Sequence, residues 1–185
     1  MTFLVTHSGQ RVDLDPPKPE QIQIADIAWA LSQQVRFVGH VDRAYTVAQH
    51  SVHVAELATK VDPSLGLAGL LHDAEEAYLG DWSSPLKKVF RERGCGLPFQ
   101  LADQFKSAIG ARFGVELLDE SPIVKQADDR MYVTERRDLR SALAGQRSWS
   151  RDNYPDPVPE PIYVWSQSVA YQVFLACFRR CGGVA

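Results

Sequence analysis

The feature that most constrains the fold is a ten-residue stretch at positions 67–76, which reads LAGLLHDAEE. It is apolar as far as Leu71 and turns acidic after His72. A helix that carries leucine and alanine on every side is a buried helix, because no face of it suits water. His72 and Asp73 continue this run, and buried polar atoms need partners. A divalent metal ion suits both residue types at once, so further ligands elsewhere in the chain decide what the stretch can do.

The composition is that of a globular protein. The 185 residues are 45% apolar and 23% charged, and a chain of this length fits one domain, here residues 1–185, that buries about two-thirds of its unfolded surface. The net charge of −3 provides no general attraction to nucleic acid polymers or anionic membranes, so neither is an expected partner. No apolar run approaches the roughly 20 residues of a membrane span, and the N-terminus lacks the features of a signal peptide. A cytoplasmic location is therefore expected.

Hydrophobic periodicity predicts an all-α bundle of six or seven helices with a small N-terminal β-hairpin. The hairpin covers residues 1–14, and a proline-rich lead continues to residue 19. The helix that follows Asp62 is expected to run without a break to Leu79, with Gly80 as its C-terminal cap. A polar arm with alternating prolines, residues 145–161, is expected to lie extended over the surface. The predicted helices begin near Glu20, Thr46, Pro63, Pro85, Leu101, Pro122 and Val164.

Three of the predicted helices supply candidate metal ligands. His50 lies on the core-facing stripe of its helix, and His72 and Asp73 lie about 100° apart around the next one. Asp128 directly follows Ala127, a stripe position on a later helix. Two histidines and two aspartates form a mixed nitrogen and oxygen set, which suits Mn²⁺, Co²⁺, Fe²⁺, Ni²⁺ or Zn²⁺ better than Ca²⁺. Four protein ligands leave an octahedral ion two positions for water or a phosphate oxygen.

Each candidate ligand taken alone also has a plainer interpretation. His50 on an apolar face is compatible with a core histidine whose polar atoms bind other protein groups. Adjacent His72 and Asp73 occur together by chance in many proteins, and Asp128 is compatible with a solvated helix face. The combination of the four residues is what favours a metal site. Glu76, one turn after His72, is placed to border the same cleft.

Four segments of the chain resemble the HD-domain metal-dependent phosphohydrolases. They are AQHSV at 48–52, LLHDAEEAYLGD at 70–81, PLK at 85–87 and VKQAD at 124–128. The resemblance spans about residues 24–143 and is greatest to the bacterial 5′-deoxynucleotidases and their phage deoxynucleoside-triphosphatase relatives. It implies a helical bundle that hydrolyses a phosphoester or phosphoanhydride. It also implies one divalent cation, Co²⁺, Mn²⁺, Fe²⁺, Ni²⁺ or Zn²⁺, with the ligands His50, His72, Asp73 and Asp128.

The same resemblance implies roles for residues around the metal. Glu76 matches an acidic residue that transfers protons near the attacking water, and a carboxylate suits that role. Asp81 matches a residue that contacts the sugar hydroxyl, although it is equally placed to cap the helix that follows it. Arg36 stands near a phosphate-binding arginine, and Lys87 offers further positive charge. Phe37 stands where the deoxynucleotidases have tryptophan, so it can pack against a sugar but lacks the indole hydrogen bond. Glu76 and Asp81 are thus the candidate catalytic residues.

The function expected from the resemblance is hydrolysis of deoxynucleoside 5′-monophosphates to nucleoside and phosphate. One alternative is a triphosphohydrolase that releases triphosphate from a deoxynucleoside triphosphate. Another is a non-catalytic HD module that binds a nucleotide, although such a module needs no carboxylate near the water. Hydrolysis of guanosine tetraphosphate-type alarmones is less favoured. Family members commonly dimerise, so a homodimer is the expected assembly.

Overall fold

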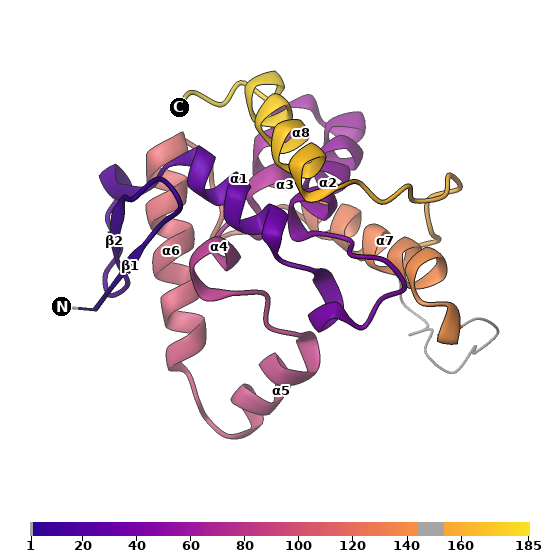
Figure 1. Cartoon of the computed structure of the whole chain (residues 1–185), viewed down its shortest axis with the longest axis horizontal. Coiled ribbons are helices and arrows are strands. Elements are labelled where there is room, and N and C mark those ends of the chain that lie inside the picture. Colours follow the sequence, from indigo (N-terminus) through magenta and orange to yellow (C-terminus); the bar gives the residue numbers. More distant parts are fainter. Residues whose placement is uncertain (1, 144–153) are drawn as a thin grey trace.

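The computed structural model describes residues 2–143 and 154–185 and is mostly α-helical. A two-stranded antiparallel hairpin at the N-terminus lies to one side of the helices (Figure 1). The predicted all-α bundle with an N-terminal hairpin is therefore confirmed. No helix in the described ranges is long and apolar enough to cross a membrane.

The hairpin pairs β1 (Phe3–Val5) with β2 (Arg11–Asp13), and Leu4 lies opposite Val12. The helices are α1 (Ile24–Gln33), α2 (Val47–Val61), α3 (Gly66–Leu71), α4 (Glu76–Leu79), α5 (Ser84–Glu92), α6 (Leu97–Phe113), α7 (Pro122–Leu139) and α8 (Gln167–Arg180). Short 3₁₀ turns lie at Pro19–Gln21, Arg36–Gly39, Pro63–Leu65 and Ser141–Leu143. Counted with α3 and α4 as one interrupted helix, the described part of the chain has seven helices.

The helix at the centre of the bundle is α2, which packs against α1, α3, α7 and α8. Small residues on several of its sides, including Ala48, Ser51, Ala55 and Ala58, are fully buried and let these neighbours approach. A larger hydrophobic cluster joins α2 to α1, α6, α8 and the hairpin, and a smaller one joins it to α7. His50 consequently lies deep inside the molecule.

The start of α2 is only partly as its sequence predicts. The spacing of Thr46 and Gln49 predicts a capping box, and the Thr46 hydroxyl does accept a hydrogen bond from the Gln49 backbone N–H at 3.2 Å. The reciprocal bond, from the Thr46 backbone N–H to the Gln49 side chain, is not formed. The Gln49 side chain instead donates to the Tyr163 carbonyl at 2.8 Å and accepts from the Trp165 N–H at 2.9 Å. It therefore fastens the segment that leads into α8.

The prediction of one unbroken helix from Pro63 to Leu79 is wrong at residues 72–75, which form a turn between α3 and α4. Backbone hydrogen bonds to the residue three back, such as Glu76 N–H to the Asp73 carbonyl at 3.1 Å, tighten the chain there. This 3₁₀-like spacing changes the direction of the side chains in the turn. The two ends are as predicted: Asp62 caps the first turn, and Gly80 ends α4 with a φ of 84°.

Gly69 brings α3 unusually close to α2. A Cβ atom at this position would lie 3.0 Å from the Cα atom of Ala55, which is closer than real Cβ atoms normally approach. The absence of a side chain therefore permits the contact that places His72, three residues later, beside His50.

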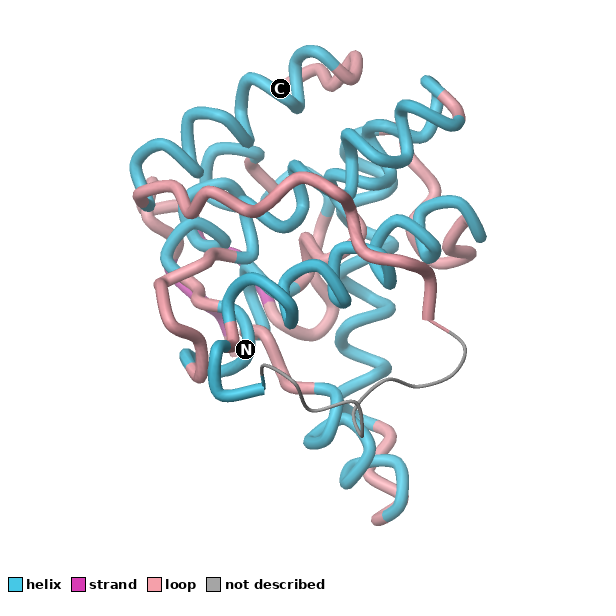
Figure 2. The backbone as a smooth tube through the Cα atoms, turned by 90° about the vertical axis from the view of Figure 1, so that its right-hand side faces the viewer, coloured by secondary structure: helices cyan, strands magenta, loops and turns pink. Residues whose placement is uncertain are grey.

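Residues 154–166 form an extended segment that leads back to α8, drawn as a long loop in Figure 2. Arg137 of α7 donates to the carbonyls of Val158 and Glu160, and Val158 N–H donates to the Thr134 hydroxyl at 2.9 Å. The described part of the predicted proline-rich arm is thus extended along α7. Residues 145–153 of that arm lie outside the described residues.

Candidate metal centre

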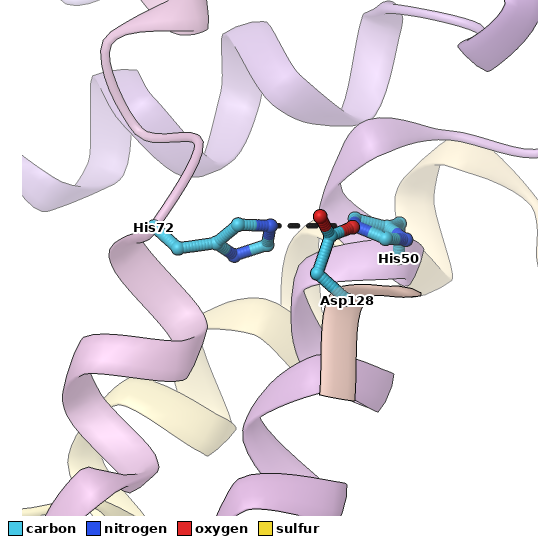
Figure 3. A group of neighbouring side chains, drawn as sticks. All are labelled: His50, His72 and Asp128. Atoms are coloured by element: carbon cyan, nitrogen blue, oxygen red, sulfur yellow. Dashed lines mark hydrogen bonds and ion pairs between the residues drawn. The ribbon is translucent and has the colours of Figure 1, made fainter. Parts of the chain in front are cut away.

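Two histidines and an aspartate from three helices point toward one another in Figure 3. His50 comes from α2, His72 from the end of α3, and Asp128 from α7. One ligand atom from each lies within 4.8 Å of the others. His50 and His72 are buried and Asp128 is partly exposed, so the group has a closed inner side and an open outer side.

Asp73 joins this group from the turn after α3. Its Oδ2 lies 3.1 Å from His72 Nε2 and 3.8 Å from His50 Nε2. The two Nε2 atoms are 3.3 Å apart, and His50 Nε2 is 3.2 Å from Asp128 Oδ1. Asp73 is therefore close to both histidines, although it lies outside the group of His50, His72 and Asp128, whose ligand atoms are all within 4.8 Å of one another.

The other ring nitrogen of each histidine fixes its orientation. His50 Nδ1 lies 2.6 Å from Glu135 Oε1, and His72 Nδ1 lies 2.8 Å from the carbonyl oxygen of Gly69. A carbonyl oxygen and an ionised carboxylate only accept hydrogen bonds, so each Nδ1 carries the hydrogen in the neutral ring. Each Nε2 then presents a lone pair. Four acceptors, two nitrogens and two carboxylates, face the same small space.

This arrangement fits a divalent metal ion. Metal–ligand distances of about 2.1 Å place neighbouring ligand atoms about 3.0–3.4 Å apart in octahedral or tetrahedral geometry. The closest separations here, 3.1–3.3 Å, match that range. Histidine rings whose second nitrogen donates to a carboxylate or a carbonyl are typical of metal ligands. The donor set favours a transition metal over Ca²⁺ or Mg²⁺.

The electrostatics of the group also favour a positive charge at its centre. Burial lowers the pKa of His72, but the carboxylates of Asp73 and Asp128 outweigh it and raise the pKa to about 9. Burial raises the pKa of Asp73, but the neighbouring histidines and Arg36 hold it well below its usual range. Protons are thus attracted to the same atoms that would ligate a metal ion.

A cleft of about 490 Å³ opens beside the group. This volume lies in the range of small-molecule sites. Its lining includes Asp73 and Asp128 of the candidate metal group. It also includes every other residue predicted from the sequence to act on substrate. The latter are Arg36, Phe37, Glu76, Asp81 and Lys87. The two histidines lie behind this lining.

Glu76 lies on the wall of the cleft next to Lys87, whose ammonium group is 3.3 Å from Glu76 Oε1. The Glu76 side chain is buried, and its Oε2 has no hydrogen-bond partner among the residues that the structure describes. Burial raises the pKa of Glu76 well above its usual range, and the charges of Asp73 and Asp81 raise it further. Glu76 therefore holds a proton more readily than an exposed glutamate does.

Asp81 does not cap the helix that follows it, because the N-cap of α5 is Ser83. Its backbone N–H donates to the Gln34 side-chain oxygen at 2.9 Å, while the Gln34 amide donates to the Glu76 carbonyl at the same distance. Gln34 thus fixes Asp81 relative to Glu76.

Lys88 is exposed, and its ammonium group lies 3.7 Å from Glu92 Oε1 on the surface of α5.

Arg36 and Phe37 lie on the short turn between α1 and α2. Arg36 Nε donates to Glu135 Oε2 at 2.9 Å, and its Nη1 lies 3.7 Å from Asp73 Oδ2. The Phe37 ring stacks against Tyr132 with a centroid separation of 6.0 Å. The guanidinium of Arg140 lies 5.3 Å from the Phe37 ring. The turn thus offers the cleft a cation and an aromatic surface side by side.

Several residues at this site were not predicted from the sequence. Gln34, Tyr132, Arg136 and Arg140 carry no motif, and only their positions in the fold bring them to the cleft or beside it. Glu135 had a usable signal. It lies seven residues, or two turns, after Asp128, and so faces the same side of α7.

Comparison with known proteins gives two relatives. The uncharacterized protein YfdR of Escherichia coli K12 is 36% identical over 139 residues, which cover 75% of this chain and 73% of YfdR. An uncharacterized protein of Rhodobacter capsulatus is 37% identical over 160 residues, which cover 82% of this chain and 79% of that protein.

The chain belongs to the same family as YfdR. Neither relative's name states an activity, and no family model matches the chain. Membership in the YfdR family therefore establishes kinship, while the chemistry has to be inferred from the residues of the cleft.

Proposed function

We propose that the protein is a divalent-metal-dependent phosphohydrolase of nucleotides, with deoxynucleoside 5′-monophosphates as the preferred substrates. The observation that carries the proposal is the convergence of four acceptor groups beside a cleft with cations in its wall. His50, His72, Asp73 and Asp128 supply the acceptors, and Arg36 and Lys87 line the cleft. The resemblance to HD-domain phosphohydrolases gives the reaction class.

His50, His72, Asp73 and Asp128 would hold the ion. A divalent metal bound there would act as a Lewis acid toward the phosphate and lower the pKa of a water molecule. Arg36 binds the phosphate group, because its guanidinium keeps donors free beyond the one that Glu135 occupies. Lys87, whose ammonium group lies 3.3 Å from Glu76 Oε1, adds a second cation to the cleft. These two charges offset those of a phosphate dianion.

Glu76 exchanges the proton. Its unpartnered Oε2 and raised pKa suit a group that takes a proton from the attacking water and returns it to the leaving oxygen of the nucleoside. General acid–base catalysis of this kind typically contributes about a hundredfold to ten-thousandfold in rate. Lys87 keeps the carboxyl group in place between these two events.

The nucleoside end of the substrate lies against Phe37 and Asp81. Phe37, backed by Tyr132, offers a flat apolar surface to the sugar or base. Asp81, positioned by Gln34, accepts a hydrogen bond from a sugar hydroxyl. A phenyl ring cannot donate a hydrogen bond, so selection between ribose and deoxyribose falls to Asp81.

Two further arginines in the cleft favour a second candidate reaction, the release of triphosphate from a deoxynucleoside triphosphate. Arg136 and Arg140 line the same cleft as Arg36. Additional cations of this kind suit a longer phosphate chain. The product, phosphate or triphosphate, separates the two reactions.

The test is a substrate panel. Purified protein is freed of metal with a chelator and reloaded in turn with Mn²⁺, Co²⁺, Ni²⁺, Fe²⁺ and Zn²⁺. Ribo- and deoxynucleoside mono- and triphosphates are then assayed for phosphate and triphosphate. We expect release of phosphate from deoxynucleoside monophosphates with at least one of these ions.

His72→Ala, with His7→Ala as a matched control, links activity to the site. His72→Ala should lower metal affinity and activity together by at least about a hundredfold, since changes to groups behind metal ligands already cost about 10- to 100-fold. His7 stacks on Trp29 by the hairpin, so its replacement should change neither. Full metal-dependent hydrolysis by His72→Ala would exclude the proposal. Tight nucleotide binding without turnover in the wild type would favour a binding module instead.

A further inference from the structure

Glu135 is a fully buried carboxylate that contacts two functional residues at once. Its Oε1 lies 2.6 Å from His50 Nδ1, and its Oε2 accepts from Arg36 Nε at 2.9 Å. We propose that Glu135 is a positioning residue that orients His50 for the metal and Arg36 for the phosphate, and so couples the two binding events. The phosphate half of this inference rests on the proposed function, whereas the metal half does not.

Because Glu135 is completely buried, its carboxylate needs polar partners such as these two. A carboxylate removed from water is costly unless charged or hydrogen-bonded partners compensate it. Glu135 has no exposed surface; its Oε1 faces His50, its Oε2 faces Arg36, and the phenol of Tyr45 lies near the same carboxylate. Loss of either partner would leave a buried charge incompletely compensated. The carboxylate, the His50 ring and the Arg36 guanidinium therefore form one unit whose parts fix one another.

For His50, the contact determines which ring nitrogen carries hydrogen. The carboxylate accepts the hydrogen of Nδ1, and this leaves the lone pair on Nε2, the atom that faces His72 and Asp128. If the hydrogen moved to Nε2, the ring could not ligate an ion at this centre. The backbone carbonyl of Gly69 does the same for His72. Glu135 is a side chain and can be replaced by mutation, whereas this backbone carbonyl cannot.

For Arg36, the contact fixes the plane of the guanidinium. Nε is committed to Glu135, so both terminal nitrogens remain available, and Nη1 points to within 3.7 Å of Asp73. Arg36 lies on a turn where Phe37 and Val38 both have positive φ, near 57°. Such a turn needs outside contacts to hold it, and Glu135 supplies one from α7.

Glutamine cannot replace this carboxylate in both contacts. The amide has one acceptor oxygen and one donor nitrogen, whereas the site presents two donors. If the amide oxygen faces Arg36, the amide nitrogen faces His50 and requires the hydrogen to move to Nε2. If the oxygen faces His50, two donors oppose each other at Arg36. Glu135→Gln should therefore weaken metal binding, phosphate binding or both, with almost no change in side-chain volume.

The experiment compares Glu135→Gln with Asp26→Asn and Arg36→Lys. Asp26 is also a buried carboxylate with several hydrogen bonds, but these go to Thr6 and Ser8 of the hairpin, away from the cleft. Zn²⁺ affinity is measured by competition with a chelator. Binding of inorganic phosphate is then measured on protein saturated with Zn²⁺. The hydrogen position on the His50 ring is read by long-range ¹H–¹⁵N NMR.

We expect Glu135→Gln to lower Zn²⁺ affinity about 10- to 100-fold and, in the metal-free protein at a pH where the ring is neutral, to move the hydrogen of His50 from Nδ1 to Nε2. Phosphate binding to the Zn²⁺-saturated variant should also be weaker. Arg36→Lys keeps a cation beside Glu135, so it should weaken phosphate binding more than Zn²⁺ binding. Asp26→Asn should lower thermal stability without changing Zn²⁺ affinity. A loss of stability in Glu135→Gln with unchanged Zn²⁺ affinity and an unchanged His50 ring would overturn the inference.

Two outcomes separate this inference from the proposed function. If the wild type hydrolyses no nucleotide but Glu135→Gln still loses Zn²⁺ affinity, the positioning role stands and the proposed reaction fails. If hydrolysis occurs and Glu135→Gln binds Zn²⁺ as well as the wild type, the proposed reaction stands and the positioning role fails. Should Glu135→Gln not fold, the metal-free wild type decides, measured at a pH where the His50 ring is neutral. Hydrogen on His50 Nδ1 supports the inference, and hydrogen on Nε2 refutes it.

Discussion

Two neighbouring residues at the rim of the cleft have a backbone conformation that their side chains disfavour. Phe37 and Val38 have φ values of 57° and 56°, in the left-handed region that β-branched residues rarely occupy. Each such residue costs about 1–3 kcal/mol. The turn is held by the Glu135 contact to Arg36 and by the backbone bond from Arg36 N–H to the Tyr45 carbonyl. Strain of this kind is characteristic of residues that are held for binding.

Replacement of Val38 by glycine tests the strain directly. Val38 is 63% exposed, so little packing is lost, and glycine adopts a positive φ without steric cost. After the added entropy of the unfolded chain is subtracted, Val38→Gly should stabilise the protein by about 0.5–1 kcal/mol in denaturant unfolding. The control is Val61→Gly at the end of α2, where valine is 67% exposed and φ is helical. Val61→Gly should destabilise the protein by up to about 1 kcal/mol. Equal effects in the two variants would contradict the assignment of strain.

The residues of the metal centre could be predicted because residue type and spacing carry that information. His50 and His72 continue buried helical segments, and Asp73 follows His72, so all three side chains already need polar partners. Glu135 could not be assigned in the same way. A glutamate on α7 is as compatible with a solvated helix face, and only the packing of α7 against α2 buries it.

Among the elements, the interruption between α3 and α4 matters most to the site. Consecutive side chains lie about 100° apart around an α-helix and about 120° apart in a 3₁₀ turn. Within this turn, Asp73 Oδ2 lies 3.1 Å from His72 Nε2. Glu76 begins α4 directly after it, on the wall of the cleft.

Gly69→Ala should show that the distance between α2 and α3 controls the metal centre. The added Cβ would lie 3.0 Å from the Ala55 Cα atom and 3.3 Å from its backbone nitrogen, so α3 has to move. Overpacking of this kind costs about 1–3 kcal/mol, partly offset by the helix preference of alanine. We expect lower stability and weaker Zn²⁺ binding together.

Gly96→Ala is the matched control for this change. Gly96 precedes α6 with helical dihedral angles, and its nearest neighbour would be 3.9 Å away. The melting temperature and the Zn²⁺ affinity of Gly96→Ala should be unchanged or slightly higher. If Gly69→Ala behaved in the same way, the close approach of the two helices would not be what positions His72.

Most helices could be predicted from apolar periodicity and from caps such as Ser121 before Pro122, whose hydroxyl accepts from the Ile123 N–H. The break at residues 72–75 could not. Its sequence is compatible with a continuing helix, and the local hydrogen bonds that tighten it do not depend on any breaker residue. The side chain of Gln49 also escaped prediction, because its partners at Tyr163 and Trp165 are more than 110 residues away in the sequence.

Across the whole molecule, the candidate metal centre joins parts of the chain that are far apart. The candidate ligands come from α2, from the turn after α3 and from α7, with Arg36 and Glu135 lying 99 residues apart in the sequence. An ion bound by all four candidate ligands would cross-link these helices in the folded state only. Metal binding should therefore contribute directly to stability.

Removal of metal should lower the melting temperature. At a free metal concentration of about 100 times Kd, binding to the folded state adds about 2.7 kcal/mol, which corresponds to about 5–10 °C for a chain of this size. Differential scanning calorimetry with Zn²⁺ and with a chelator should show this difference in the wild type and no difference in His72→Ala. A shift of equal size in both proteins would mean that the ion acts elsewhere.

The central claim is that one divalent ion is bound between the two histidines and the two aspartates. An anomalous difference map from crystals grown with Zn²⁺ and measured at the zinc edge tests it most directly. We predict one peak within about 2.0–2.2 Å of His50 Nε2, His72 Nε2 and a carboxylate oxygen of Asp73 and of Asp128. Bound Zn²⁺ only at other positions, or no peak at this centre when Zn²⁺ is in excess, would contradict the claim.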